Sequence, residues 1–290
     1  MNTRAFCAGL RKTLEQAGID NAAFEARILL EAALGKEAAT RMLVCDAPIS
    51  NAQTRQTELL LRRRLAGEPL QYLCGSWDFL DSTFAVGEGV LIPRPETEEL
   101  VLLALERMRE MKAPTVFDLC AGSGCIGLSV KRRRPDANVY LFEKSGDALH
   151  YCNENRCALG LARSVPLVQA DILRGYEAFR SFPVPDVILS NPPYIPSDEL
   201  FALQREVQRE PAMALDGGAD GLTFYRALAE AWVPFLKDGA LVGVECGEDQ
   251  AQTVAALFAG AGFITEICRD FNQTERFVFA RRGTEKEGTL

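Results

Sequence analysis

The chain has 290 residues, of which 48% are hydrophobic and 25% charged, a composition typical of a globular protein with room for about two domains. Its formal net charge of −8 argues against a protein that binds nucleic acid mainly by neutralising phosphates. The single histidine, His150, excludes metal sites built from several histidines, and we expect it to pack or lie at the surface. Two pairs of the nine cysteines are spaced C-x4-C, wider than the common zinc spacing, so we expect reduced thiols and no metal.

The first part of the chain predicts helices over residues 4–17, 20–33, 38–44 and 50–67. Phe6, Leu10 and Leu14 recur at helical spacing, and Ser50 with Gln53 forms a capping-box pattern. The run Arg62–Arg64 falls in the last turn of the fourth helix, where positive charge suits the helix dipole. A solvated helix end is predicted, with a contact patch for an acidic partner as the alternative. Residues 1–67 are therefore predicted to form an all-helical domain.

The pattern changes after residue 67. Aromatic residues, glycines and alternating apolar residues predict a β-hairpin linker over residues 68–95. An amphipathic helix over 96–111 is followed by strands near 116–119, 138–142, 166–169, 186–190 and 241–245, with helices between them. This alternation predicts an α/β domain over 96–282 with a Rossmann-like, mostly parallel sheet, ending in an antiparallel pair of strands. Residues 283–290 read as a frayed tail.

A glycine-rich turn follows the first of these strands. It comprises Asp118, Cys120, Ala121, Gly122, Ser123 and Gly124, with Gly127 three residues later. The glycines alone also match a dinucleotide fingerprint, so an NAD enzyme stays an alternative. An acid at the strand end, however, would repel a pyrophosphate and suits the amino group and sulfonium of S-adenosylmethionine. Asp-x-x-x-Gly-x-Gly resembles motif I of the class I methyltransferases.

Two further strand ends carry acids. Glu143 is placed to accept hydrogen bonds from both hydroxyls of a ribose, which NAD and S-adenosylmethionine share. Asp171 and Ile172 follow the next strand. In the methyltransferase layout this position borders the adenine ring, where the acid accepts from the exocyclic amine and the apolar neighbour covers the ring.

The motif Asn191-Pro192-Pro193-Tyr194 follows the strand over 186–190 and is the most specific signal in the chain. Two prolines cannot continue a strand ladder, so they fix a rigid loop. The Asn191 side-chain oxygen and the Pro192 carbonyl can accept both hydrogens of a planar –NH2 group, and Tyr194 can stack on it. We predict a catalytic and substrate-binding site for an amide or an aromatic amine, which needs neither a metal nor a strong general base. The glycine-rich stretch over 216–221 lacks calcium ligand spacing and predicts a turn beside this site.

The surrounding residues resemble one family. Residues 67–72 with Gly75, the stretch 91–98 (Leu-Ile-Pro-Arg-Pro-Glu-Thr-Glu), the stretch 214–222 and the ending 269–276 are similar to release-factor glutamine-N5 methyltransferases, the HemK family. Two departures are Cys120, where a glycine often opens the turn, and Glu143, where an aspartate is more usual.

The resemblance implies methyl transfer from S-adenosylmethionine, leaving S-adenosylhomocysteine, to the glutamine of the Gly-Gly-Gln loop of bacterial-type release factors. It implies that Asp118, Gly122, Gly124 and Glu143 hold the cofactor, that residues 191–194 hold the glutamine, and that the helical domain helps recognise the release factor. A ribosomal-protein glutamine methyltransferase, a DNA adenine-N6 methyltransferase and a non-catalytic binding module remain alternatives. Because no apolar run suits a signal peptide or spanning helix, and nothing demands a dimer, we expect a cytoplasmic monomer that binds neither DNA nor membranes.

Overall fold

A computed structural model describes residues 1–283, and its contacts divide the chain into two units. The helical unit comprises Met1–Ser76 together with Gln204–Arg209, and the sheet unit comprises the rest. The predicted boundary at residue 67 differs from this division, and the predicted tail lies outside the described residues apart from Gly283. None of the helices in residues 1–283 is both long and apolar enough to cross a membrane.

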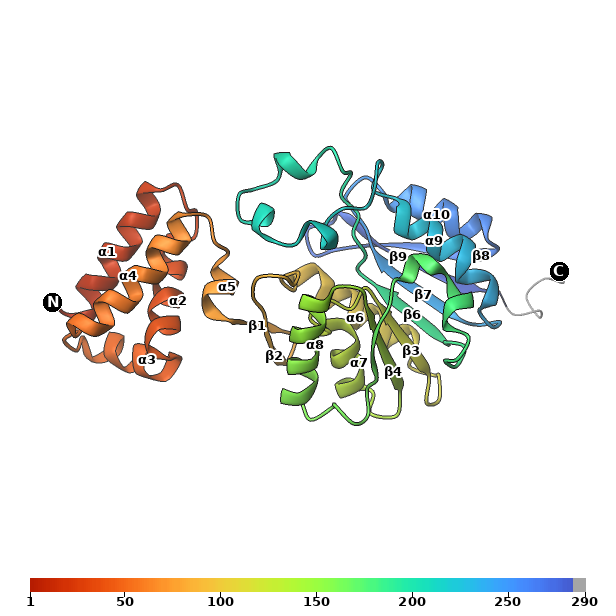
Figure 1. The fold of residues 1–290 in the computed structure, drawn as a ribbon, viewed down its shortest axis with the longest axis horizontal. Coiled ribbons are helices and arrows are strands. Elements are labelled where there is room, and N and C mark those ends of the chain that lie inside the picture. Colours follow the sequence, from red (N-terminus) through yellow and green to blue (C-terminus); the bar gives the residue numbers. More distant parts are fainter. Residues whose placement is uncertain (284–290) are drawn as a thin grey trace. The chain divides into compact units, whose positions relative to one another are not determined.

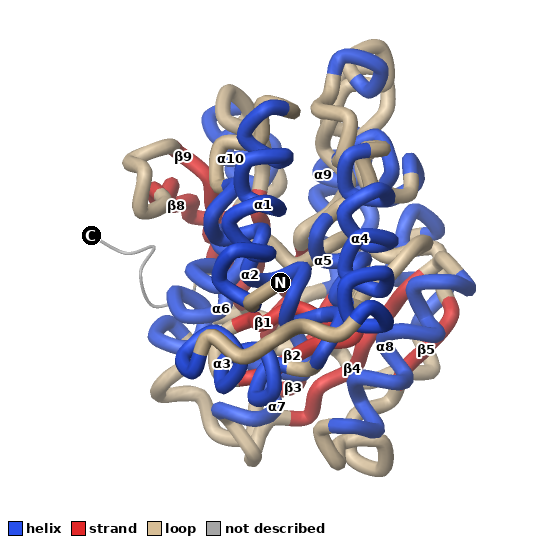
Figure 2. Tube along the Cα trace, turned by 90° about the vertical axis from the view of Figure 1, so that its left-hand side faces the viewer, coloured by secondary structure: helices blue, strands red, loops and turns tan. Residues whose placement is uncertain are grey.

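Five helices form the helical unit: α1 (Thr3–Gln16), α2 (Ala22–Leu34), α3 (Lys36–Cys45), α4 (Asn51–Leu65) and α5 (Leu70–Cys74) (Figures 1 and 2). Leu10, Leu14 and Leu29 are fully or almost fully buried, as the helical spacing predicts. The capping box at Ser50 is confirmed, since Ser50 and Gln53 exchange side chain–backbone hydrogen bonds. The short helix α5 belongs to this unit because it contacts α2 and α4, which extends the unit beyond residue 67.

Arg64, in the last turn of α4, is buried and paired. Its guanidinium donates to both carboxylate oxygens of Glu25, at 2.7 and 3.0 Å, and to Glu206 at 2.7 Å. Arg62 and Arg63 are exposed. The prediction of a solvated helix end is therefore wrong for Arg64, because Glu206 arrives from a segment that follows 142 residues later. A buried guanidinium is tolerated only with such partners.

The sheet unit begins with a hairpin of β1 (Ser76–Phe79) and β2 (Ser82–Ala85), followed by α6 (Pro95–Arg107). Its main sheet has seven strands in the order β5-β4-β3-β6-β7-β9-β8. These are β3 (Thr115–Leu119), β4 (Asn138–Glu143), β5 (Leu167–Gln169), β6 (Val187–Ser190), β7 (Leu241–Glu245), β8 (Phe263–Arg269) and β9 (Glu275–Arg282). The mostly parallel sheet and its antiparallel end are confirmed; the strand that runs against the others is β9, one place in from the edge.

Helices cover both faces of this sheet. The core on one face includes residues of α6, α7 (Cys125–Arg133) and α8 (Gly146–Ala158), and the other includes residues of α9 (Thr223–Ala231) and α10 (Ala251–Gly260) (Figure 1). Consecutive β3 residues alternate, since Val116 belongs to the first core and Phe117 to the second. The strand order reverses at β3, where β4 lies on one side and β6 on the other. Ligands of such sheets bind beyond the carboxyl ends of the strands at this switch point.

Candidate active site

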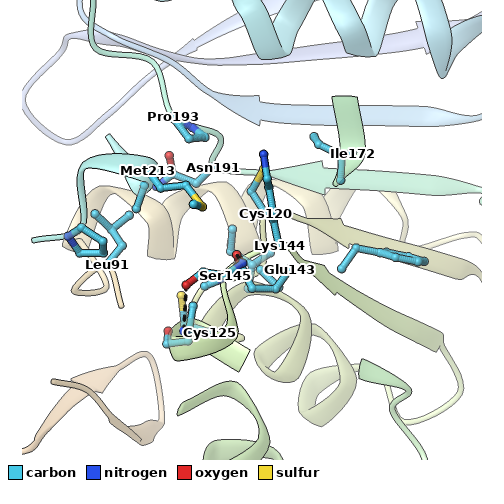
Figure 3. A pocket seen from close by; sticks show the side chains of 18 of the residues that line it. Leu91, Cys120, Cys125, Glu143, Lys144, Ser145, Ile172, Asn191, Pro193 and Met213 are labelled. Atoms are coloured by element: carbon cyan, nitrogen blue, oxygen red, sulfur yellow. Dashed lines mark hydrogen bonds between the residues drawn. The ribbon is translucent and has the colours of Figure 1, made fainter. Parts of the chain in front are cut away.

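A cavity of about 880 Å³, partly open to solvent, lies beyond the carboxyl ends of β3, β4 and β6. We call the part formed by residues 120–126 and 143–145 the turn side. The part formed by Asn191 and Pro193 with residues 91–94 and 211–214 is the proline side. Figure 3 shows Asn191, Pro193 and Met213 together, apart from Glu143, Lys144 and Ser145.

The glycine-rich turn has the conformation that its sequence predicts. Cys120 adopts a left-handed φ of 63°, which explains why a glycine would be easy at this position. A Cβ on Gly127 would lie 2.3 Å from Leu141 Cδ2, so a larger residue there would have to displace the Leu141 side chain. Cys120, Ala121, Gly122 and Ser123 line the cavity, whereas Gly124 is buried behind it.

Glu143 lines the cavity and also holds the turn. Its Oε2 accepts from the backbone N–H of Gly122 at 2.8 Å, and Oε1 accepts from that of Ser145 at 2.7 Å. A carboxylate has about four lone-pair sites, so Glu143 can still accept hydrogen bonds from a ligand's hydroxyls.

Asp118 is fully buried and lies behind the lining of the cavity. Its Oδ2 accepts from the backbone N–H of Gly127 at 2.8 Å, while Oδ1 is buried without a hydrogen-bond partner in the described part of the chain. Burial raises the pKa of Asp118 to about 7, against the lowering effect of the Gly127 hydrogen bond. The structure thus shows Asp118 as a brace between β3 and α7, and its contact with a ligand stays a prediction.

Asp171 and Ile172 both line the cavity, together with the apolar Phe142 and Ala170. Lys144 pairs with Asp171 Oδ2 at 2.8 Å, and the backbone N–H of Leu173 donates to Oδ1. Partial burial acts to raise the pKa of Asp171, but the Lys144 and Leu173 hydrogen bonds outweigh it and lower the pKa. Apolar walls with a polar edge suit a flat heterocycle.

The motif of residues 191–194 is divided by the structure. Asn191 and Pro193 line the cavity, but Pro192 is buried and Tyr194 packs against the core of the α9 face. The Tyr194 backbone carbonyl accepts from Gln250 Nε2 at 2.8 Å. Burial raises the pKa of the Tyr194 phenol, which therefore stays protonated at neutral pH. Stacking of Tyr194 on a substrate stays a prediction.

The glycine-rich stretch over residues 216–221 packs against this motif. A Cβ on Gly217 would lie 2.7 Å from Tyr194 Cα, and a Cβ on Gly221 would lie 2.2 Å from the Tyr194 carbonyl oxygen. The predicted turn beside the site is thus confirmed. Among residues 1–283, no cluster of His, Cys, Asp and Glu has an arrangement that could hold a metal ion, and His150 is exposed on α8.

The proline side depends on residues to which sequence reasoning gave no role. Asn191 Nδ2 donates to Thr97 Oγ1 at 3.1 Å, and Thr97 Oγ1 donates to Glu245 Oε2 at 2.6 Å. The buried Glu210 accepts from the backbone N–H of Ile92 at 2.9 Å and pairs with Arg94. The only sequence signal was that Thr97 lies in the stretch 91–98 and that Glu245 ends a strand.

Known proteins resemble both units. The family model described as PrmC N-terminal domain matches residues 8–75, and that described as Methyltransferase small domain matches residues 99–218. The release factor glutamine methyltransferase of Caulobacter vibrioides is 39% identical over 271 residues, which cover 91% of either chain. That of Geobacter sulfurreducens is 38% identical over 277 residues, 94% of either chain.

Among solved structures, the 16S rRNA N2 G1207 methyltransferase of T. thermophilus, in complex with AdoMet and guanosine, shares the fold. It has a TM-score of 0.50 at 19% identity, over 71% of this chain and 49% of that chain. The two curated relatives match this chain over almost its entire length, across both the helical and the sheet unit. The chain belongs to the family of release factor glutamine methyltransferases.

Proposed function

We propose that this protein transfers a methyl group from S-adenosylmethionine to the side-chain amide nitrogen of the glutamine in the Gly-Gly-Gln loop of a peptide-chain release factor. The observation that carries the proposal is Asn191 at the wall of a cavity whose turn side suits a nucleoside. The names of the full-length relatives support the same substrate.

The turn side fits S-adenosylmethionine, which when bound supplies a methyl group on a positively charged sulfur. Glu143 can accept from the ribose hydroxyls, and Ile172 and Asp171 border the place for the adenine. The carboxyl group of Asp118 lies behind this turn, and the nearby Lys144 is engaged by Asp171. A pyrophosphate at the turn would find this lysine already paired, which favours S-adenosylmethionine over NAD.

The proline side supplies acceptors for the substrate amide. The Asn191 Oδ1 atom and the Pro192 carbonyl accept the two amide hydrogens and hold the nitrogen towards the methyl group. The amide nitrogen would use its lone pair to form a bond to the methyl carbon. The bond between that carbon and sulfur would break, and the electrons of this bond would stay on the sulfur. Positive charge then develops on the amide nitrogen, where the two acceptors stabilise it. An N-protonated amide is a strong acid, so its proton passes to water without a general base.

Mass spectrometry of a release factor tests the proposal. The factor is incubated with this protein and S-adenosylmethionine, and the peptide that contains the Gly-Gly-Gln loop should gain one methyl group on the glutamine side chain. A matched factor with alanine in place of that glutamine should gain none. Methylation that persists in the alanine variant, or that occurs on a ribosomal protein or duplex DNA in its place, would contradict the proposal.

A further inference from the structure

Asn191 can serve the proposed reaction only if the oxygen of its side-chain amide, and not the –NH2 group, faces the substrate. An asparagine amide has an accepting oxygen on one side and a donating –NH2 group on the other, with nearly the same shape. Only the orientation that presents the oxygen can accept a hydrogen from a substrate amide. Something in the protein must therefore hold the –NH2 group away from the substrate.

A chain of two hydrogen bonds, one partly buried and one buried, meets this requirement. Asn191 Nδ2 donates to Thr97 Oγ1 at 3.1 Å, and the Thr97 hydroxyl donates to Glu245 Oε2 at 2.6 Å. Thr97 is 2% exposed and Glu245 1% exposed, so water does not compete for these groups. The three residues come from the first turn of α6, the loop after β6 and the end of β7.

The number of protons that each group carries decides which group donates in each of these two hydrogen bonds. A threonine hydroxyl has one proton, and an ionised carboxylate can only accept it. Once the Thr97 proton is given to Glu245, the Thr97 oxygen can only accept, and the partner it accepts from is the Asn191 –NH2 group. The Asn191 oxygen is thereby left for the other side of the amide.

We propose that Thr97 and Glu245 are positioning residues that fix the orientation of the Asn191 amide and so present its oxygen to the substrate. The inference rests on the proposed function of Asn191 as an acceptor. Neither residue needs to touch the substrate glutamine, since both act through Asn191.

The orientation of the Asn191 amide depends on whether Glu245 is ionised. Burial raises the pKa of Glu245 to about 7, opposed by the Thr97 hydrogen bond and by Arg276 on β9. At the start of α6, Glu96 raises the pKa and Arg94 lowers it, and the Tyr194 phenol also lies within electrostatic range. From α9, the Tyr225 hydroxyl donates to the Glu245 backbone carbonyl at 2.7 Å. A protonated Glu245 can donate to Thr97, which frees the threonine proton to bind the Asn191 oxygen and favours the reversed amide.

The matched variants Thr97→Val and Thr97→Ser test the positioning role. Valine keeps the shape without the hydroxyl, and serine keeps the hydroxyl. Thr97→Val should lower kcat about tenfold or more, the equivalent of one hydrogen bond, with the S-adenosylmethionine Kd close to that of the unchanged protein. The melting temperature should fall moderately, because the buried carboxylate of Glu245 loses its hydrogen-bond donor. Thr97→Ser should restore most of kcat.

Two further measurements separate this role from a general loss of structure. In an Asn191→Ala background, Thr97→Val should cause no additional loss of kcat, because the group that it positions is gone. In the unchanged protein, kcat should fall as the pH drops below about 7, and this decline should disappear in Glu245→Gln and persist in Thr97→Ser.

The outcomes distinguish this inference from the proposed function. Full kcat in Thr97→Val, an equal loss with and without Asn191, or an unchanged acid decline in Glu245→Gln would overturn the positioning role while methylation of the glutamine stands. Absence of methylation by the unchanged protein would overturn the proposed function, and the positioning role with it.

Discussion

The two sides of the cavity are held in place by different means. On the turn side, the carboxylates of Asp118 and Glu143 accept hydrogen bonds from the backbone N–H groups of Gly122, Gly127 and Ser145, all within one short stretch of sequence. On the proline side, Asn191 depends on a side chain 94 residues away, which in turn depends on one 148 residues further on. The turn side is thus a local structure, whereas the proline side exists only in the complete fold.

Asn191→Ala should have the largest effect, because it removes the acceptor that we propose for the substrate amide. We expect kcat to fall about 100- to 1,000-fold, the cost of losing one preorganised catalytic hydrogen bond. The Kd of S-adenosylmethionine should stay within tenfold, since the turn side is intact. Steady-state kinetics and calorimetry measure the two quantities, with Asn153→Ala on the exposed face of α8 as control. A loss confined to the Kd would reverse the assignment of the two sides.

Glu143→Gln should change the Kd of S-adenosylmethionine more than kcat. The substituted amide can accept from only one of the two backbone N–H groups and turns its own –NH2 towards the other, so the turn loosens. We expect the Kd of S-adenosylmethionine to rise roughly 10- to 100-fold, as for the loss of a charged hydrogen bond, with a smaller change in kcat at saturation. Calorimetry checks this against Glu177→Gln, an exposed residue outside the cavity. An unchanged Kd would show that the turn does not need this carboxylate.

Asp118→Asn should change the pH dependence of stability. The pKa of Asp118 is raised in the folded protein, so its contribution to the free energy of unfolding is fully present below about pH 4 and is lost as the pH rises to about 7. Asparagine does not titrate. Over this pH range the free energy of unfolding of the variant should therefore rise, relative to that of the unchanged protein, by up to roughly 4 kcal/mol.

Urea denaturation at pH 4, 5.5 and 7 measures this difference. Asp136→Asn serves as control because the Arg134 hydrogen bond lowers the pKa of Asp136, so its contribution changes only below about pH 4. Parallel pH profiles for Asp118→Asn and the unchanged protein would show that Asp118 ionises freely in the folded state.

Cys120→Gly should have the smallest effect. Relief of the left-handed backbone at Cys120 and the greater freedom of glycine in the unfolded chain nearly cancel, so the free energy of unfolding should change by less than about 1 kcal/mol. The Kd of S-adenosylmethionine should stay within a few-fold. Cys120→Val should be clearly less stable than either, because a β-branched side chain suits this φ poorly. Equal stability of the valine variant would show that the turn relaxes to another conformation.

The sequence predicted what depends on local pattern. The strands over 115–282, the glycine-rich turn and the motif at 191–194 were found because periodicity and turn chemistry act over a few residues. The burial of Arg64 could not be predicted, since its partner Glu206 follows 142 residues later. The Thr97–Glu245 hydrogen bond was missed for the same reason.

The position of Asp118 shows that sequence can place a residue in an element without predicting where its side chain points. An acid at the end of a strand can be read from sequence, but the side towards which its carboxylate turns is set by the packing of α7. Because Gly127 brings its backbone N–H within 2.8 Å of Oδ2, Asp118 lies behind the cavity wall. Sequence reasoning therefore identified the turn but expected Asp118 to face the ligand, whereas the structure buries its carboxyl group behind the cavity wall.

The assignment of Gln204–Arg209 to the helical unit means that the chain connects the two units three times, at Ser76–Trp77, Leu203–Gln204 and Arg209–Glu210. A single cut in the polypeptide near residue 76 would leave residues 1–76 joined to the rest only by non-covalent contacts with Gln204–Arg209, such as the ion pair of Arg64 with Glu206. Residues 1–76 alone do not make up the whole helical unit, because Arg64 would then lack its partner Glu206. A transplanted helical unit would need both of its segments, residues 1–76 and 204–209, to keep this ion pair.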